Sequence, residues 1–523
     1  MQIVVKLRDI VIDPRKSVDL AALSPEEAEA AIRSAYGFLA ADMKFEVRGG
    51  HVVITMEFDA GRDEATARDC FARGMKQAEA GRYNKAVDLF RRVLDILAEH
   101  TDARRNLAMA LLNSGRHEEA KDELIDVLRL VPDDDWALLL LGNLYARQDN
   151  DLDTAERFYL KALEIAPGNM QALTGCAAVK TERGDIEGAE ALYLKAINIA
   201  HRQPNPYYGL AVALNGVDKP AEALPVLERM FDHARFDDVR LAELRKECRE
   251  FYLRISAQVA DLRDEHYWQT TLAYRDAAAA ETGTAITIVE DNSLDNATAE
   301  CRPDWQAGGK HVVRYNARGS AVNPHIVGRE IATLKLAFDA RKAGRCFELR
   351  YLAENPTRAD IVAAHARGGG GDAELITKVV DVIMPRVLRA ALDVVTEYRL
   401  WKDFAEIRPC HVTGLFLHSR QKRNPLDQPQ VTALLPGPIR QVHEIASAAW
   451  ALAIDALCAG RTAFSEDYLN SSGLPLAREL ADAWIAAGRN PNPGDGHELT
   501  RQLVTALELG DWLDLVPCRE ATP

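Results

Sequence analysis

Carboxylates and imidazoles in the C-terminal half of the chain are the groups that metal-assisted hydrolysis would use. Glu330 is the acid of the five-residue run Arg329–Thr333, and Glu397 follows later in the sequence. A glutamate beside a metal ion can activate the water that the ion binds. Imidazole is a common ligand of transition metals. The imidazoles of this region are those of His325, His365, His411 and His418.

Two positions of the run cannot serve as metal ligands. Arg329 has no lone pair to donate and stays protonated. The Thr333 hydroxyl is a poor ligand for Zn²⁺ beside imidazole or thiolate, so these positions together with Glu397 cannot form a three-ligand catalytic site. His325 lies one turn before Arg329 on the same helix face, which leaves a relocated metal site open. No spacing signal supports that site, and a polar residue in the first helical turn is the plainer interpretation.

The segments before this run predict two strands and a helix. TAITIVED (284–291) and KHVVRYN (310–316) are strand-like. Asn323 and Pro324 predict a helix start, with Asn as the N-cap and Pro at the first helical position. Gly344 is well placed to end that helix.

This order of elements resembles the zinc-metallopeptidase (zincin) fold, in which an edge strand precedes the helix that carries H-E-x-x-H. The residues in that place are Arg329, Glu330, Ile331, Ala332 and Thr333, so only the glutamate is kept. The segment EYRLWKDFAEIRP (397–409) resembles the downstream helix that supplies a carboxylate ligand in some of these families, and Glu397 would be that residue.

The resemblance implies a degenerate site at Arg329, Glu330, Thr333 and Glu397, with no catalytic residue, no metal and no cofactor. Losing a metal would strand Glu397 in a partly dry cleft unless a cation replaced it. We therefore predict a hydrogen-bonded ion pair between Arg329 and Glu397, with Glu330 nearby. The alternative is a plain helical domain in which both glutamates face solvent.

Residues 67–236 repeat one pattern of small, turn and large apolar residues about five times. The clearest copies are Gly74, Gly81, Ala86 and Phe90; Ala108, Gly115, Ala120 and Leu124; and Ala177, Gly184, Ala189 and Tyr193. The period of ~34 residues is that of a helix–turn–helix repeat, and the pattern resembles the tetratricopeptide repeat. Such arrays present a concave surface to a protein ligand.

The resemblance implies that the first helix of each pair lines this groove. The lining positions in this chain are Phe71, Met75, Arg105, Met109, Trp136, Leu139, Asn143, Thr174, Tyr208 and Asn215. Tyr, Trp, Met and Arg are enriched at protein interfaces, so the surface suits a peptide or helix. The Lys/Asn/Arg set with which chaperone-binding repeats hold a terminal carboxylate is not matched. Alternatively, the chain's own domains fill the groove.

Composition limits the partners and the compartment. The chain has 523 residues, a net charge of −15 and eight cysteines without a CxxC pair. An acidic chain lacks the basic footprint that nucleic acid or an anionic membrane would need, so we expect neither as partner. Scattered cysteines indicate buried free thiols. Lys6, Arg8, Asp9 and Asp13 interrupt any apolar leader. We expect a cytoplasmic protein.

We predict a mainly α protein of four parts. Residues 1–60 form a small β-α-β-β unit, 67–236 the helical solenoid, 237–283 a helical cap, and 284–523 a helix-rich α+β domain that is zincin-like. The glycines at 368–371 are expected to form a flexible loop.

The expected function is a scaffold that binds a protein segment in the groove, joined to a catalytically silent peptidase-like domain. The alternative is a zinc-dependent metallopeptidase with relocated ligands, to which the repeats present substrate.

Overall fold

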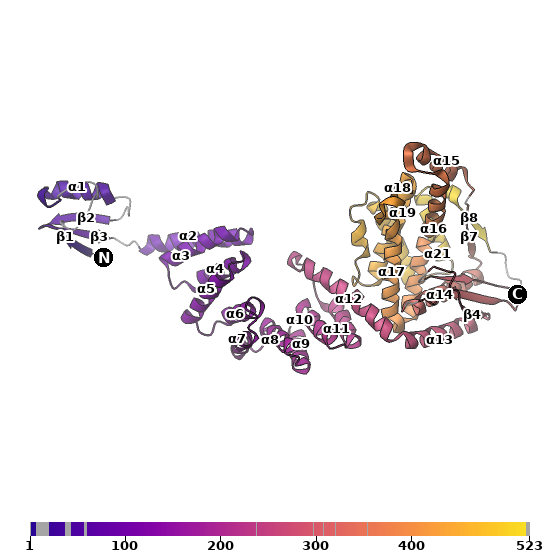
Figure 1. The fold of residues 1–523 in the computed structure, drawn as a ribbon, viewed down its shortest axis with the longest axis horizontal. Helices are drawn as coiled ribbons and strands as arrows, with labels where there is room; N and C mark the ends of the chain where they lie inside the picture. Colours follow the sequence, from indigo (N-terminus) through magenta and orange to yellow (C-terminus); the bar gives the residue numbers. More distant parts are fainter. Residues whose placement is uncertain are drawn as a thin grey trace. The chain divides into compact units, whose positions relative to one another are not determined.

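The structure is a computed structural model. It describes residues 2–6, 20–36, 43–56, 60–236, 238–295, 298–306, 308–318, 321–352 and 354–518 (Figure 1). The chain divides into two compact units, Met1–Val179 and Lys180–Pro523. Part of the strand expected near the N-terminus, at 7–12, lies outside the described residues.

The first unit begins with the predicted β-α-β-β arrangement. Its elements are β1 (Gln2–Lys6), α1 (Pro25–Tyr36), β2 (Met43–Arg48) and β3 (His51–Met56). The antiparallel sheet has the order β1-β3-β2. Gly49 and Gly50 form the hairpin turn with φ of +56° and +75°, values that favour glycine. Ser24 and Glu27 form a capping box: each side chain accepts from the other's backbone N–H, at 3.3 and 3.0 Å.

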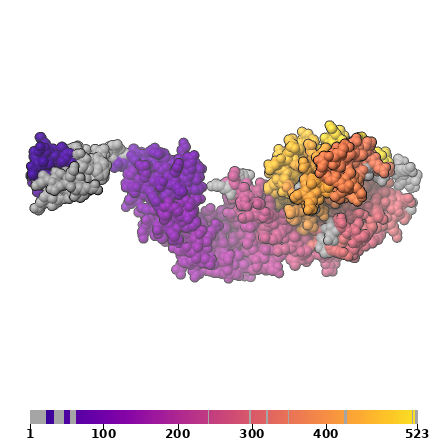
Figure 2. All heavy atoms as spheres, turned by 45° about the horizontal axis from the view of Figure 1, so that its top comes forward, coloured from indigo at the N-terminus to yellow at the C-terminus, as the bar shows by residue number. Residues whose placement is uncertain are grey.

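Helix pairs fill the rest of the first unit. They are α2 (Ala60–Glu79), α3 (Tyr83–Ile96), α4 (Thr101–Asn113), α5 (His117–Leu130), α6 (Asp135–Arg147), α7 (Leu152–Ile165) and the start of α8 (Met170–Glu182). From α2 to α7, each helix packs against the next one along the chain. In Figure 2 these helices are the purple spheres. A Cβ on Gly74 would lie 2.7 Å from the Phe90 ring, and one on Gly142 would lie 2.5 Å from the Tyr159 ring. In the repeat pattern, a glycine on one helix therefore makes room for a large aromatic ring on the next helix.

The second unit starts with the last repeats and continues into two long helices. They are α9 (Ile186–Ile199), α10 (Pro204–Gly216), α11 (Pro220–His233), α12 (Ala242–Leu262) and α13 (Asp264–Thr282). Helix α12 packs against α11 and against the later helix α17 (Arg408–Asp427), and α13 packs against α14 (Asn323–Lys342). The helical content predicted for 238–281 is confirmed, with a break at Arg263.

A three-stranded sheet precedes the helix that carries Arg329–Thr333. Strand β4 (Ala285–Glu290) runs parallel to β6 (Lys310–Tyr315), and β5 (Ala299–Arg302) is antiparallel to β6. Helix α14 (Asn323–Lys342) follows β6. Its N-cap is Val322, so the prediction that Asn323 caps the helix is wrong. Gly344 has a φ of +65° just after the helix, as predicted.

The remaining chain is mostly helical, as expected. The helices are α15 (Pro356–His365), α16 (Ala373–Asp403), α17 (Arg408–Asp427), α18 (Pro429–Leu434), α19 (Gly437–Leu457), α20 (Leu474–Arg489) and α21 (Asp495–Ala506). Two short strands that the sequence did not suggest, β7 (Phe347–Tyr351) and β8 (Leu513–Pro517), pair antiparallel.

Two further expectations concern the glycine run and the core. Ala366–Gly370 forms a π-helical turn that is interrupted at Gly369, where φ is +89°, and Gly371 follows it with a φ of +113°. The prediction of a loop at 368–371 is therefore wrong for Gly368 and Gly370, whereas Gly369 and Gly371 have non-helical backbone angles. Trp450, Trp484 and Trp512 are fully buried in the helical core. The eight cysteines are free, and the sulfurs of Cys346 and Cys518 lie 2.7 Å apart.

Candidate functional site

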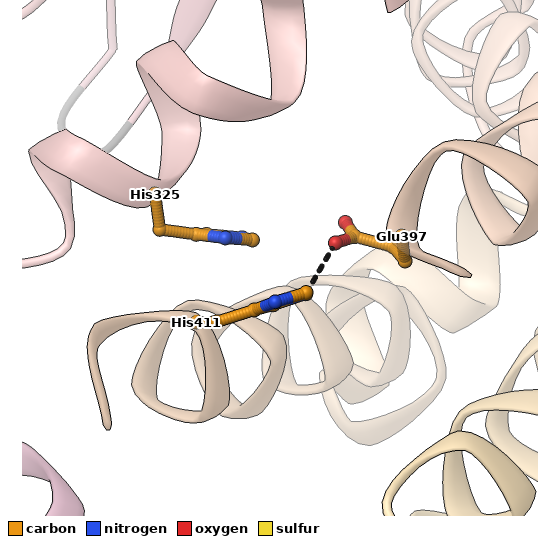
Figure 3. A group of neighbouring side chains, drawn as sticks. All are labelled: His325, Glu397 and His411. Carbon is orange, nitrogen blue, oxygen red and sulfur yellow. Dashed lines mark hydrogen bonds and ion pairs between the residues drawn. The ribbon is translucent and has the colours of Figure 1, made fainter. Parts of the chain in front are cut away.

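Three helices bring the candidate site together. Helix α14 presents His325, Arg329 and Thr333 at four-residue intervals, which places them on one face. Helix α16 contributes Asp393 and Glu397. Helix α17 contributes His411, His418 and Lys422. Figure 3 shows His325, Glu397 and His411 converging from the three helices.

The expected ion pair is present, but its expected hydrogen bond is not. Arg329 Nη1 lies 3.9 Å from Glu397 Oε1, and Arg329 Nη2 lies 3.7 Å from Glu330 Oε1. Both distances exceed a hydrogen bond. Instead, His411 Nε2 donates to Glu397 Oε2 at 2.8 Å, and Arg329 Nη1 donates to His418 Nδ1 at 3.3 Å. The prediction of a direct hydrogen bond is therefore wrong: His411 takes Glu397 Oε2, and Oε1, which faces Arg329, has no hydrogen-bond partner among the described residues.

Both glutamates are buried, so the alternative in which they face solvent is wrong. Glu397 is 0% exposed and Glu330 is 5% exposed. Burial raises the pKa of Glu330 above its usual value, since the charged form loses solvation. The Thr333 hydroxyl donates to the Arg329 carbonyl at 3.0 Å and lies 3.5 Å from the Thr396 hydroxyl.

His325 is an interior residue rather than a polar group at the helix surface. It is 2% exposed, and its ring stacks on that of His411 with centroids 4.6 Å apart. A Cβ on Gly414 would lie 2.0 Å from His325 Cδ2, so this glycine makes room for the ring. Burial holds the pKa of His325 well below its usual value, which favours neutral imidazole. His365 lies elsewhere, with Nε2 2.9 Å from the Ala433 carbonyl.

His325, Glu397 and His411 could hold a metal ion. One candidate ligand atom from each lies within 4.8 Å of the others, and two imidazoles with one carboxylate suit Zn²⁺ or another first-row metal. Two features oppose this use. Among the residues that the structure describes, neither His325 nor His411 has a hydrogen-bond partner for Nδ1, whereas ligating histidines usually have one. The Arg329 guanidinium also directs a fixed positive charge toward Glu397.

A cavity of about 420 Å³ adjoins this cluster. Its polar lining includes residues that sequence reasoning missed, above all Asp393, Lys422 and His443, all buried. Burial lowers the pKa of Lys422 to about 8 and that of His443 to about 4. The sequence contained one indication of this site: the spacing of His411, His418 and Lys422 along α17 places them near one face of the helix.

Several predicted groove residues of the first unit support the repeats themselves. Arg105 pairs with the buried Asp134, and Asn143 accepts the Tyr159 hydroxyl hydrogen bond at 2.8 Å. Leu139 is only 3% exposed and belongs to the interior. The half-buried residues are Phe71, Met75, Arg105, Met109, Trp136, Asn143 and Thr174.

The predicted groove residues of the second unit are Tyr208 and Asn215, and both are half-buried. The Tyr208 ring packs edge-on against Phe251 of α12, with centroids 5.6 Å apart. The helix that follows the repeats therefore covers part of Tyr208, in line with intramolecular occupation at that end.

Comparisons with known proteins identify the repeats. Tetratricopeptide repeat models match residues 77–144 and 137–169. The protein O-mannosyl-transferase Tmtc3 of Drosophila melanogaster is 31% identical over 121 residues, which are 23% of this chain and 13% of that protein. The chain therefore contains tetratricopeptide repeats, a module that generally mediates protein–protein interactions.

Three solved structures illustrate the similarity. A thermophilic TPR protein of Thermus thermophilus is 20% identical over 36% of this chain and 98% of its own, with a TM-score of 0.30. YrrB, described as a TPR protein with an unusual peptide-binding site, is 15% identical over 36% of this chain and 95% of its own, with a TM-score of 0.28. MamA is 23% identical over 34% of this chain and 97% of its own, with a TM-score of 0.28. In the part of the chain that the structure describes, no helix is long and apolar enough to cross a membrane.

Proposed function

We propose that this protein is an interaction scaffold that holds a protein or peptide segment on its tetratricopeptide repeats. The observation that carries the proposal is Trp136, on the first helix of a pair inside the matched repeats. It is only half-buried, unlike Trp450, Trp484 and Trp512 of the C-terminal core. Partly exposed tryptophan is a typical anchor of protein interfaces.

The C-terminal domain, in this proposal, is a zincin-like domain without peptidase activity. Strand β5 is antiparallel to β6 in the sheet that precedes α14, as the resemblance requires of an edge strand. The side chains of Glu330 and Glu397 both lie within 4 Å of the Arg329 guanidinium. Arg329 takes the place of the first metal-binding histidine. Its charge compensates Glu397 and Glu330 where a metal would otherwise do so.

The groove is tested by selecting peptides from a display library on the full-length chain. The affinity of a selected peptide is then measured for the wild type and for two variants. Trp136→Ala should weaken binding by about 2 kcal/mol, or ~30-fold, because it truncates an interface aromatic. Leu160→Ala is the matched control, since Leu160 is 49% exposed on α7, the second helix of its pair. Equal loss in both variants, or none in either, would refute the groove assignment.

A second candidate function is metal-dependent hydrolysis with relocated ligands. The observation that favours it is the convergence of His325, Glu397 and His411. When bound there, a divalent ion would polarise a substrate carbonyl or activate water. Zinc titration of the wild type and of His411→Asn separates the candidates: tight equimolar binding lost in the variant, together with peptide cleavage, would favour the hydrolase.

A further inference from the structure

The cavity of about 420 Å³ beside the degenerate site has the size of a small-molecule pocket. It lies between α14, α16, α17 and α19, and the residues before and within β5 close one side. Part of its wall is apolar, formed by Ile326, Val382, Pro385, Val387, Ala390 and Ala446. Its remaining wall is rich in charged side chains.

Four cations line the cavity. Among the residues that the structure describes, two of these cations have no ion-pair partner, and a third, Lys422, has an ion pair but no hydrogen-bond acceptor. Lys422 is 6% exposed, and its ammonium lies 3.8 Å from Asp393 and 5.3 Å from the Trp450 ring centre. Within the described chain it has no hydrogen-bond acceptor. Arg386 and Arg389 are exposed at the lining, and neither pairs with a described carboxylate at ion-pair distance. The fourth cation is Arg329.

The acids of the lining do not fully compensate these cations. Asp381 is already paired with residues that do not line the cavity: it accepts two hydrogen bonds from Arg358 and one from the Tyr351 hydroxyl. Glu330 faces Arg329, whose Nη2 lies 3.7 Å from its Oε1, so these two charges offset each other. Asp393 remains the main counter-charge, so the cavity carries an excess of positive charge.

A buried ammonium without a hydrogen-bond acceptor is costly unless a ligand supplies one. Carboxylate and phosphate oxygens are the acceptors that arginine and lysine bind most strongly. We propose that this cavity binds a small organic oxyanion, with its charged group at Lys422 and the arginines and its carbon skeleton against the apolar wall. The site would give the peptidase-like domain a ligand-binding role that is independent of the repeat groove.

Calorimetric titration of the full-length protein tests the site, with succinate and inorganic phosphate as probes and neutral succinamide as the control ligand. Lys422→Met and Arg389→Gln should each weaken binding about tenfold or more, because each removes a charge-assisted contact. Arg389 is exposed, so its substitution does not threaten folding. Arg420→Gln, an exposed arginine on α17 outside the lining, is the matched protein control.

The proposal predicts that at least one anion binds, that succinamide does not, and that only the cavity variants lose affinity. Preference for succinate or phosphate identifies the class of oxyanion. Absence of binding by both anions, or equal affinity in all variants, would overturn the proposal. Binding of the groove peptide should be the same in the wild type and Arg389→Gln, so failure of the cavity and failure of the groove are distinguishable.

Discussion

Replacing Arg329 by Met should destabilise the C-terminal domain more than replacing Arg329 and Glu397 together. Glu397 is fully buried, and Arg329 Nη1 lies 3.9 Å from its Oε1, which has no hydrogen-bond partner among the described residues. At an effective dielectric constant near 20, two charges at that distance attract by ~4 kcal/mol. Arg329→Met removes this attraction and leaves the carboxylate uncompensated.

Breaking a buried ion pair costs about 3–5 kcal/mol. The Arg329 side chain is 22% exposed, so we expect the lower end, ~3 kcal/mol. In Arg329→Met/Glu397→Gln the neutral amide still accepts the hydrogen bond from His411, so position 397 no longer carries an uncompensated charge. Glu330 loses its contact with Arg329 equally in both variants, so it does not affect the comparison. The double variant should therefore lose only ~1 kcal/mol, so that the two substitutions couple by ~2 kcal/mol or more.

Urea unfolding followed by tryptophan fluorescence measures the effect. All tryptophans except Trp136 lie beyond residue 260, so the signal reports mainly the C-terminal unit. A wild-type-like far-ultraviolet circular dichroism spectrum serves as the check on folding. If Arg329→Met and the double variant lose equal stability, the ion pair does not hold these helices together, and the interpretation of Arg329 as a substitute for a metal fails.

The remaining predictions concern one repeat and one buried histidine. Gly142→Ala should lower the free energy of unfolding of the repeats by about 1–3 kcal/mol, because the new Cβ would lie 2.5 Å from the Tyr159 ring. Gly168→Ala, which meets no atom within 4 Å, is the control, and equal thermal shifts would contradict the packing argument. His443 has a pKa of about 4 when folded, so between pH 6.5 and 4 the unfolded chain binds more protons and stability falls with acid. His443→Asn should remove up to ~3 kcal/mol of that acid sensitivity in urea titrations at pH 7 and 4.5, and an unchanged sensitivity would show that other groups cause it.

The repeats were the part of the fold that the sequence predicted best. Their period recurs locally, and pairs such as Gly74 with Phe90 lie within one helix–turn–helix. The hairpin at Gly49 and the capping box at Ser24 are also local signals. Short strands such as β5 have too few residues to show alternation, so they were missed.

The candidate site was only partly predictable because its residues meet through tertiary packing. That Arg329 and Glu397 lie close together was predicted only from the zincin resemblance, in which the corresponding positions bind one metal ion. His411 entered the sequence analysis only as an available imidazole, since no spacing links it to α14. Lys422 was missed, because a lysine near the end of a helix is ordinarily exposed.

Zinc content and peptide cleavage, measured together on protein never exposed to a metal-affinity column, test the central claim most directly. The account of a scaffold with a silent peptidase-like domain predicts well under one zinc ion per chain, and no cleavage of a diverse peptide mixture even when zinc is added. Equimolar zinc that a chelator removes, with loss of peptide cleavage, would contradict it.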